Sequence, residues 1–491
     1  MVSLPQILIK RPEVDSFYTF STVELPEQYC RGLACFASRS LNEKIFSKSK
    51  VQIPRTYCLG FCYAGPSYSK GYYKRPIIDI KTKKSVLLKD IVKDRIYDIE
   101  QYISLDGLSA LKKALNMEPI DIIKEVKESG LRGRGGAYFP TGLKWESAYN
   151  QREEERYLII NGDEGDAGAY IDKVLMEDNP YLVIEGALIA AYAIGAKTIY
   201  IYVRKEYPFA YETMKKAINE FKNKGLIGTN ALKGRSINII LEKGKGSYVV
   251  GEETAMINAI MGLRGEPRAR PPYPTELGLF NKPTVVNNVE TISNIPWIIK
   301  NSGKSYYELG FNKSRGTKLI SLNNLFNKPG VYEVEFGISL NEIVYNIGDG
   351  LKNNLPLKML IIGGPLAGPI LPNELDTKLG VEELRNINAS LGHGNIIAFS
   401  NDTTAFDLLY EIIDFAAYES CGKCFPCRFG TQSLLSIVEN AKKRGYFTKE
   451  ESNSIERIAR VMKSQSLCGH GVGTGDAVLS IINKLRDEVV K

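Results

Sequence analysis

Residues 129–145 read Ser-Gly-Leu-Arg-Gly-Arg-Gly-Gly-Ala-Tyr-Phe-Pro-Thr-Gly-Leu-Lys-Trp and follow a predicted helix at 117–128. Glycines at 133, 135 and 136 permit positive φ and let backbone N–H groups approach a ligand, while two arginines and Lys144 add positive charge. The loop suits a phosphate or a flat ring system, although it matches neither a P-loop nor a dinucleotide fingerprint. A ligand-free surface loop is the alternative, which the combination of glycines, aromatic and basic residues disfavours.

The composition indicates a large folded chain with an ordinary surface. At 491 residues, with 44% hydrophobic residues, the chain can form three or four domains. Its net charge of +8 comes from 64 basic and 56 acidic residues spread along the whole length, so we expect no nucleic-acid binding. We recognise no signal peptide, and the most apolar segment, 182–196, contains a glutamate and is too short to cross a bilayer. We therefore expect a cytoplasmic protein without direct membrane insertion, associated with a membrane only through partner subunits.

Four of the eight cysteines predict a metal centre near the N-terminus: Cys30, Cys35, Cys58 and Cys62. Disulfides are an alternative, but nothing indicates secretion. The C-x4-C and C-x3-C spacings are unusual for zinc, whereas two pairs of thiolates can each hold one iron of a [2Fe–2S] cluster. The sequence thus favours this cluster over zinc, in a small α/β unit at 4–82 that begins with a strand at 7–9.

The other four cysteines lie in a region of predicted helices: Cys421, Cys424, Cys427 and Cys468. The C-x2-C-x2-C run suits three corners of a [4Fe–4S] cluster, and Cys468 is the only cysteine left in this half to complete it. Zinc or a redox-inert site is the alternative. We expect His470 at most to contact that cysteine ligand, without binding the metal itself. We expect His393 to be a loop residue without a role in proton transfer.

Between the two cysteine sets, strands and helices alternate. Strands are predicted at 157–160, 198–203 and 237–241, with helices at 180–196 and 208–224. This alternation predicts a doubly wound α/β sheet, whose ligands bind at the carboxyl ends of the strands. Acidic residues follow two of these ends, and carboxylates accept hydrogen bonds from ribose or ribityl hydroxyls. Stabilisation of a helix N-terminus is the alternative role for Glu252 and Glu253.

Six ordered segments resemble the flavin- and NADH-binding subunit of respiratory complex I and the diaphorase components of NAD-linked hydrogenases and formate dehydrogenases. The segments are 130–145, 161–172, 248–254, 265–274, 282–291 and 419–427. The N-terminal cysteine pairs resemble a thioredoxin-like [2Fe–2S] ferredoxin module. The resemblance implies a thioredoxin-like module at 1–82, an FMN- and NADH-binding α/β domain at 83–325, a β-grasp-like domain at 326–402 and a helical bundle with a [4Fe–4S] cluster at 403–491.

The resemblance also implies which residues bind the cofactors. Contacts with FMN are expected from Gly133, Arg134, Gly135, Lys144, Asn161, Asp163, Val286, Asn287, Asn288 and Thr291. Contacts with NAD(H) are expected from Gly136, Ala137, Phe139, Glu164, Asp166, Arg270 and Tyr273. A further motif adds Tyr248, Gly251, Glu252 and Glu253 to the same cofactor site.

The function implied by the resemblance is that of an NADH dehydrogenase, or diaphorase, subunit. NADH would pass a hydride to FMN, and single electrons would reach the [4Fe–4S] cluster and other electron-transfer subunits, while the protein orients the cofactors and excludes water. No catalytic side chain is expected. Three features depart from the family: Tyr138 replaces a glycine, Ser147 replaces an aromatic residue, and only 22 residues separate Cys35 from Cys58. Because of Tyr138 and Ser147, a passive electron-relay or assembly subunit with a lapsed nucleotide site is the second hypothesis.

Overall fold

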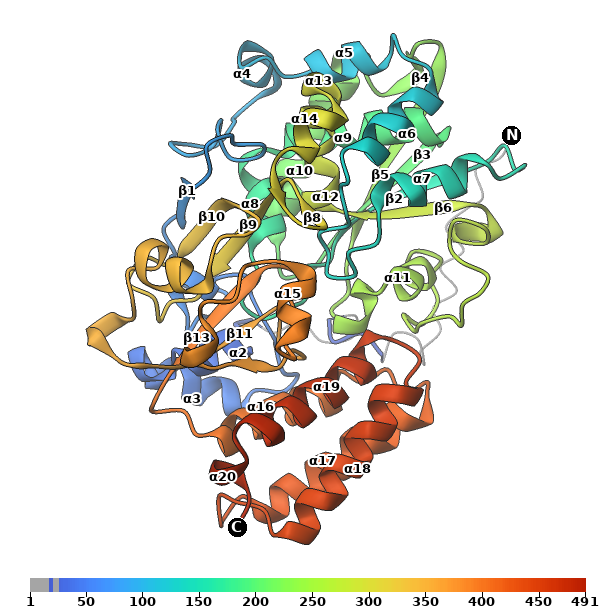
Figure 1. Cartoon of the computed structure of the whole chain (residues 1–491). Helices are drawn as coiled ribbons and strands as arrows, with labels where there is room; N and C mark the ends of the chain where they lie inside the picture. Colours follow the sequence, from blue (N-terminus) through green and yellow to red (C-terminus); the bar gives the residue numbers. More distant parts are fainter. Residues whose placement is uncertain (1–16, 21–25) are drawn as a thin grey trace.

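Two sheets and a helical bundle organise the protein, whose computed structural model describes residues 17–20 and 26–491 (Figure 1). The strand predicted at 7–9 lies outside the described residues. The five-stranded sheet and its helices form one end of the molecule, the six-stranded sheet lies in the middle, and the C-terminal helices form the opposite end. None of the described helices has the length and apolar character needed to cross a bilayer.

The five-stranded sheet has the order β4-β5-β3-β2-β6. Its strands are β4 (Gly228–Leu232), β5 (Arg235–Lys243), β3 (Thr198–Val203), β2 (Tyr157–Gly162) and β6 (Thr284–Asn288). All neighbours run parallel except β4 and β5, and the three predicted strands are present. Because β3 and β6 lie on opposite sides of β2, the strand order reverses between β2 and β6. Open α/β sheets bind ligands at such a switch point.

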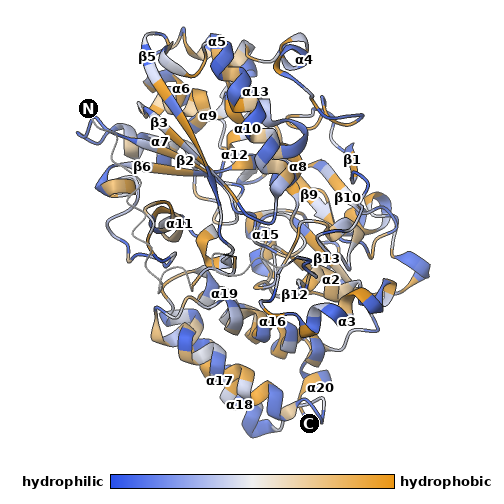
Figure 2. Ribbon diagram, turned by 180° about the vertical axis from the view of Figure 1, so that it is seen from behind, coloured by the Kyte–Doolittle hydropathy of each residue, from blue (hydrophilic) through white to orange (hydrophobic). Residues whose placement is uncertain are grey.

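Both faces of the central strands of this sheet are buried. Along β2, Leu158 and Ile160 belong to the same core as helices α9 (Pro180–Ile194) and α10 (Pro208–Asn223). The alternate residue Ile159 belongs to a separate core with α11 (Glu253–Ile260). Burial on both faces explains the continuous apolar run in the β2 sequence. Figure 2 shows the hydrophobic residues gathered where helices meet strands, and hydrophilic residues prominent on the outer helices.

Short helices connect these elements and surround the sheet. They are α4 (Ile99–Ser104), α5 (Ser109–Ala114), α6 (Pro119–Glu128), α7 (Thr141–Tyr149), α8 (Ile171–Asp178), α12 (Val289–Ser293), α13 (Ile295–Asn301) and α14 (Gly303–Tyr307). The glycine loop runs from the end of α6 to the start of α7, so two helices fix both of its ends.

The six-stranded sheet is mixed and has the order β1-β10-β9-β13-β11-β12. Its strands are β1 (Ile77–Ile80), β10 (Gly330–Glu335), β9 (Thr317–Leu322), β13 (Asn395–Ser400), β11 (Leu357–Ile362) and β12 (Pro369–Ile370). Two of them, β1 and β9, come from outside the predicted 326–402 unit. The sheet therefore joins three segments of the chain that the sequence assigned to different units.

The N-terminal cysteine region differs from the predicted α/β module. In the described part of residues 26–76, the structure has α2 (Leu33–Ala37), α3 (Glu43–Val51) and short 3-10 turns, but no strand. Only isolated bridges connect its ends, and the one strand near it, β1, pairs with β10 instead. The helix expected at the first cysteine pair is present as α2, and the short Cys35–Cys58 connection is occupied by the end of α2 and by α3. Their apolar side chains join the core that also contains α9 and α10.

The C-terminal region is helical, as predicted. Helices α16 (Ala405–Glu419), α17 (Phe425–Ala441), α18 (Lys449–Gln465) and α19 (Gly469–Lys484) form the bundle, and α20 (Arg486–Val489) ends the chain. Cys424 lies at the N-cap of α17 and Cys468 at the N-cap of α19. Two helix starts therefore carry two of the four C-terminal cysteines.

Candidate functional site

A cavity of about 970 Å³ opens at the carboxyl ends of β2 and β6. Asn161 of β2 lies opposite Asn288 of β6 in the register of these two parallel strands. The cavity is thus at the switch point of the sheet, and its volume is at the upper end of the range for small-molecule sites. The glycine loop, α11 and the start of α19 supply its other walls.

Every predicted cofactor-binding residue except Arg134 lines this one cavity. The lining residues that were predicted are Gly133, Gly135, Gly136, Ala137, Phe139, Lys144, Asn161, Asp163, Glu164, Asp166, Tyr248, Gly251, Glu252, Glu253, Arg270, Tyr273, Val286, Asn287, Asn288 and Thr291. Residues that the sequence did not indicate also line it, among them Thr141, Asp172 and His393. Within the described residues, the Thr141 hydroxyl and His470 Nδ1 are buried without a protein partner, so they are available to a ligand.

The glycine loop approaches β6 closely. A Cβ on Gly135 would lie 3.1 Å from Cβ of Asn288, and Gly136 has φ +114°, a conformation that side chains disfavour. The Arg134 N–H donates to Thr291 Oγ1 at 2.7 Å, which ties the loop to the start of α12. Bare backbone therefore faces the cavity, as the sequence predicted.

The predicted role of the Arg134 side chain was wrong. Its guanidinium is buried away from the cavity, where it donates to the Tyr306 hydroxyl at 2.9 Å and to the Arg315 carbonyl at 2.7 Å. It also lies over the Phe336 ring. Inward-facing carbonyls of a neighbouring turn hold this cation, and sequence spacing does not reveal them. Arg134 therefore positions the glycine loop and brings no positive charge to the cavity.

Two other cations do reach the cavity and meet at one carboxylate. Lys144 Nζ lies 2.9 Å from Glu253 Oε2, and Arg270 Nη1 lies 2.9 Å from Glu253 Oε1. Burial acts to raise the pKa of Glu253, but these two cations overcome it and lower the pKa. Glu252 caps α11 by accepting from the N–H groups of Thr254 and Ala255. The helix-stabilising role considered for Glu252 is therefore present in the structure.

The acidic loop after β2 is buried and highly connected. Burial raises the pKa of Asp163 well above its ordinary value. Asp166 accepts from the Tyr248 hydroxyl at 2.7 Å, yet burial still raises its pKa. Glu164 accepts from the first N–H groups of α8, at 2.6 Å from Ile171, 2.8 Å from Asp172 and 3.0 Å from Lys173. Carboxylates capping a helix in this way are fixed in place.

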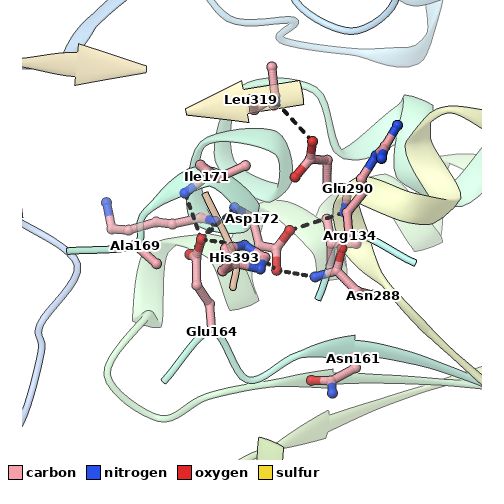
Figure 3. Close-up of polar contacts among 12 residues, drawn as sticks. Arg134, Asn161, Glu164, Ala169, Ile171, Asp172, Asn288, Glu290, Leu319 and His393 are labelled. Carbon is pink, nitrogen blue, oxygen red and sulfur yellow. Dashed lines mark hydrogen bonds and ion pairs between the residues drawn. The ribbon is translucent and has the colours of Figure 1, made fainter. Parts of the chain in front are cut away.

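His393 is not the simple loop residue that we expected. It is 4% exposed, and its Nε2 lies 3.1 Å from Glu164 Oε1 and 3.3 Å from Asp172 Oδ2 (Figure 3). Burial acts to lower the pKa of His393, but the two carboxylates raise it to about 9. The sequence offers no signal for this contact, because the turn at 392–394 lies more than 200 residues beyond both acids.

The C-terminal cysteines reach the cavity wall. Cys468, with the residues at 469 and 470, lines the cavity, and Cys421 packs against Val249 and Ala255. Burial raises the pKa of Cys427 to about 12 and that of Cys468 to about 11. The charges of the other three cysteines also raise the pKa of Cys427, and the charge of Cys421 raises that of Cys468. Lys423, between the first two of these cysteines in the sequence, has its Nζ 3.1 Å from Glu266 Oε1. The four thiols are thus gathered beside the cavity at the start of two helices.

The N-terminal cysteines are also gathered, on the other side of the acidic loop. All four are buried and free, Cys58 Sγ lies 3.5 Å from Cys62 Sγ, and a hydrogen bond with Cys35 lowers the pKa of Cys30 to about 6. The Gly168 N–H donates to Cys62 Sγ at 3.3 Å. The thiols therefore form two close pairs directly behind residues 167–169.

The spacing of the donor atoms bears on which metal each set suits. One tetrahedral zinc ion requires sulfurs about 3.8 Å apart, since Zn–S bonds are about 2.3 Å. Among the described residues, one group of three His, Cys, Asp or Glu side chains has its donor atoms within 4.8 Å of one another. It consists of Glu164, Asp172 and His393. Neither cysteine set is that compact. Both sets suit a larger, multinuclear group better than a single ion.

Comparisons with known proteins agree with this site. Residues 126–297 match the Nuo51 FMN-binding domain, and residues 407–491 match the NADH-ubiquinone oxidoreductase-F iron-sulfur binding region. The chain is 38% identical to the NADH-quinone oxidoreductase F subunit of Aquifex aeolicus over 420 residues, which is 85% of this chain and 97% of that protein. It is also 38% identical to the NADP-reducing hydrogenase subunit HndC of Solidesulfovibrio fructosivorans over 391 residues, 79% of each chain.

A solved structure extends the similarity to nearly the whole chain. The crystal structure of an NAD+-reducing [NiFe]-hydrogenase in the H2-reduced state aligns with a TM-score of 0.80 and 26% sequence identity. The alignment covers 97% of this chain and 86% of the hydrogenase chain. The mixed α/β architecture with parallel strands is therefore shared with that protein.

Proposed function

The chain belongs to the family of NADH-quinone oxidoreductase F subunits, and from this we propose that it is the NADH-oxidising module of a multi-subunit electron-transfer complex. The observation that carries the proposal is the single cavity at the β2/β6 switch point, where bare glycine backbone, buried acids and Cys468 meet. When bound, FMN supplies the conversion between two-electron hydride transfer and single-electron transfer. The side chains of this protein need only bind, orient and shield.

The residues fit FMN and a dinucleotide in distinct ways. Gly135 and Gly136 let a flat ring approach the backbone, and the amides of Asn287 and Asn288 offer donors and acceptors at the end of β6. Lys144 is the cation that can accompany a phosphate. Phe139 and Tyr273 are about half exposed, so their rings are free to stack on an adenine.

The balance of charge in the cavity supports NAD(H) over NADP(H). Arg270 already lies between Glu252 and Glu253, at 3.8 Å and 2.9 Å. An additional ribose phosphate would have to displace these acids or lie beside them, and like charges repel. We therefore propose NADH as the preferred nucleotide.

The two cysteine sets extend the site on both sides. We propose that Cys421, Cys424, Cys427 and Cys468 hold a [4Fe–4S] cluster beside the cavity, and that Cys30, Cys35, Cys58 and Cys62 hold a [2Fe–2S] cluster behind the acidic loop. Support for the second comes from the two close thiol pairs and from the Gly168 N–H that donates to Cys62. We propose accordingly that regions 1–82 and 403–491 carry the clusters, that 83–325 binds FMN and NADH, and that 326–402 contributes the cavity wall with His393.

The passive-relay hypothesis rested on Tyr138 and Ser147, and their surroundings weaken it. The Tyr138 ring is 2% exposed and belongs to the core of the six-stranded sheet. The Ser147 hydroxyl donates to Thr275 Oγ1 at 2.9 Å at the cavity edge. Both residues line the cavity, but each side chain is held by other parts of the protein, which supports an open nucleotide site.

Anaerobic titration tests the proposal. Purified, reconstituted protein should contain FMN, and its flavin absorbance should bleach on addition of one equivalent of NADH, with a much slower response to NADPH. Replacement of Glu253 by lysine, which reverses a charge in the nucleotide wall, should weaken the response to NADH and leave bound FMN in place. Flavin-loaded protein that is inert to both nucleotides would instead establish the passive relay.

A further inference from the structure

The turn that carries His393 is pressed against the glycine loop. A Cβ on Gly136 would lie 3.7 Å from Gly392, and the Tyr138 hydroxyl donates to the Gly392 carbonyl at 2.9 Å. Tyr138 has φ 56° and a buried ring, a costly conformation for a bulky residue that its packing must compensate. The residue that departs from the family pattern is thus the one that holds the His393 turn at the cavity.

His393 lies between two buried carboxylates. Apart from His393, the described groups that donate to these two acids are neutral. Glu164 accepts from α8 N–H groups and from the Tyr207 hydroxyl at 3.2 Å, and Asp172 accepts from the Glu290 N–H at 3.0 Å and from Asn288 Nδ2 at 2.5 Å (Figure 3). Two carboxylates this close repel each other strongly unless a cation lies with them. A neutral imidazole would leave that repulsion in a buried site.

Among the described residues, the other buried cations near these acids already have partners. Arg204 donates to the Glu164 backbone carbonyl and forms an ion pair with Glu206 at 2.9 Å. Lys318 is fully buried and forms an ion pair with Glu290, and burial lowers its pKa. Asp166, in the same loop as Glu164, adds a further carboxyl group, and the charge of His393 acts to lower the pKa of that group. Of the groups facing His393, Glu164, Asp172 and Asp166 are acidic and only Lys318 is basic. The imidazolium is therefore the charge that balances this wall of the cavity.

We propose that His393 is a positioning residue for the flavin and that, as an imidazolium, it holds Glu164 and Asp172 together. The charge of this cavity wall depends on the proton of His393. The midpoint potential of the bound flavin then depends on the same proton. The inference rests on the proposed function, because it assumes that flavin binds in this cavity. His393 lines the cavity together with Asn288 and Thr291. Reduction of a bound flavin adds electrons, so a nearby positive charge favours the reduced form.

A divalent cation among Glu164, Asp172 and His393 is the competing explanation, since the three donor atoms lie within 4.8 Å of one another. The contacts disfavour it. Glu164 already accepts from three N–H groups that orient it toward α8, and the ammonium of Lys318 would repel a metal ion. A histidine proton satisfies the same acids without displacing any of these bonds.

Spectroelectrochemical titration of the flavin-loaded protein tests the proposal. His393→Gln removes the charge and keeps a polar side chain, the double variant His393→Gln/Asp172→Asn removes one charge of each sign, and Lys449→Gln removes an exposed cation from α18 as a matched control. At pH 7, we expect His393→Gln to favour oxidised over reduced flavin at least tenfold more than wild type, a fall of about 30 mV for a two-electron couple. The double variant should recover at least half of that shift, and Lys449→Gln should match wild type.

Three results would overturn the proposal. The first is a midpoint potential of His393→Gln equal to that of wild type. The second is a double variant whose potential is shifted as far as that of the single variant. The third is zinc, magnesium or manganese bound stoichiometrically to wild type and lost only in His393→Gln. If His393→Gln does not fold, the flavin potential of wild-type protein is measured as a function of pH. The proposal requires this potential to fall more steeply with pH around the ionisation of His393 than at pH 7. A chain purified without flavin would refute the proposed function, and urea unfolding, which needs no flavin, would then decide the role of His393.

Discussion

Replacing His393 by glutamine should remove a pH-dependent part of the folding free energy. The imidazole pKa is about 9 in the folded protein and 6.5 without the fold. A group whose pKa is raised by folding stabilises the fold fully below its unfolded pKa and loses that contribution as pH rises through the folded value. The full contribution is about 3 kcal/mol, and about 2 kcal/mol of it is lost between pH 7 and pH 9.

The neighbouring acid acts in a different pH window. Burial raises the pKa of Asp172 from 3.8 to about 7, so its contribution also declines with rising pH, but mainly between these two values. Above pH 7 most of the remaining change at this pair therefore belongs to His393. Cysteines and tyrosines that titrate at higher pH are present in wild type and variant alike, so their effects cancel in the difference.

Urea unfolding at pH 7, 8 and 9 under anaerobic, reducing conditions measures this difference. The stability of wild type relative to His393→Gln should shrink by about 2 kcal/mol from pH 7 to pH 9. Lys449→Gln, which alters an exposed residue, should remain parallel to wild type across the range. A wild-type advantage that stays constant with pH would refute the ionised histidine, because a neutral packing contact does not titrate.

Three further predictions concern other parts of the site. Cys424→Ser should abolish the four-iron signal in electron paramagnetic resonance and leave FMN binding intact, because Cys424 does not line the cavity. Lys144→Met should weaken FMN binding by about tenfold or more, measured by fluorescence release of flavin, since a charge-assisted bond is worth about 1.5–3 kcal/mol. Lys318→Met should lower the free energy of unfolding by about 3–5 kcal/mol, because Glu290 is left as an unpaired buried charge.

Much of the site was predictable because its motifs are local in sequence. The glycine loop, the acidic loop after β2 and the β6 segment each combine a strand or helix end with unusual residues, and parallel strands bring their carboxyl ends to one edge. The same logic predicted the doubly wound sheet. It did not predict β6 as a strand, since its five residues include the two amides of the site and follow no alternating pattern.

The features that escaped prediction depend on contacts between distant segments. Arg134 lies among basic residues in the sequence, yet carbonyls at 315 and 317 draw its guanidinium away from the cavity. His393 is flanked by glycines, and only the fold brings it to Glu164. The six-stranded sheet recruits β1 from a region read as part of the cysteine module. In each case the partner is set by tertiary packing, which neither spacing nor composition encodes.

Gly168 connects the N-terminal cysteines to the cavity, and its replacement tests whether both sites respond together. It has φ +98°, and a Cβ there would meet Ile397 at 2.9 Å and the Asn395 amide at 3.0 Å. Gly168→Ala should therefore shift the loop whose N–H donates to Cys62 and whose preceding residues, including Asp166, line the cavity. We expect changes in both the two-iron resonance signal and the flavin absorbance, with a stability cost of about 1–3 kcal/mol.

Gly445→Ala, at φ +73° with no atom within 4 Å of its Cβ, carries similar backbone strain without these contacts and should change neither signal. A Gly168→Ala variant whose two-iron signal changes while the flavin spectrum stays fixed would mean that the acidic loop does not couple the two sites.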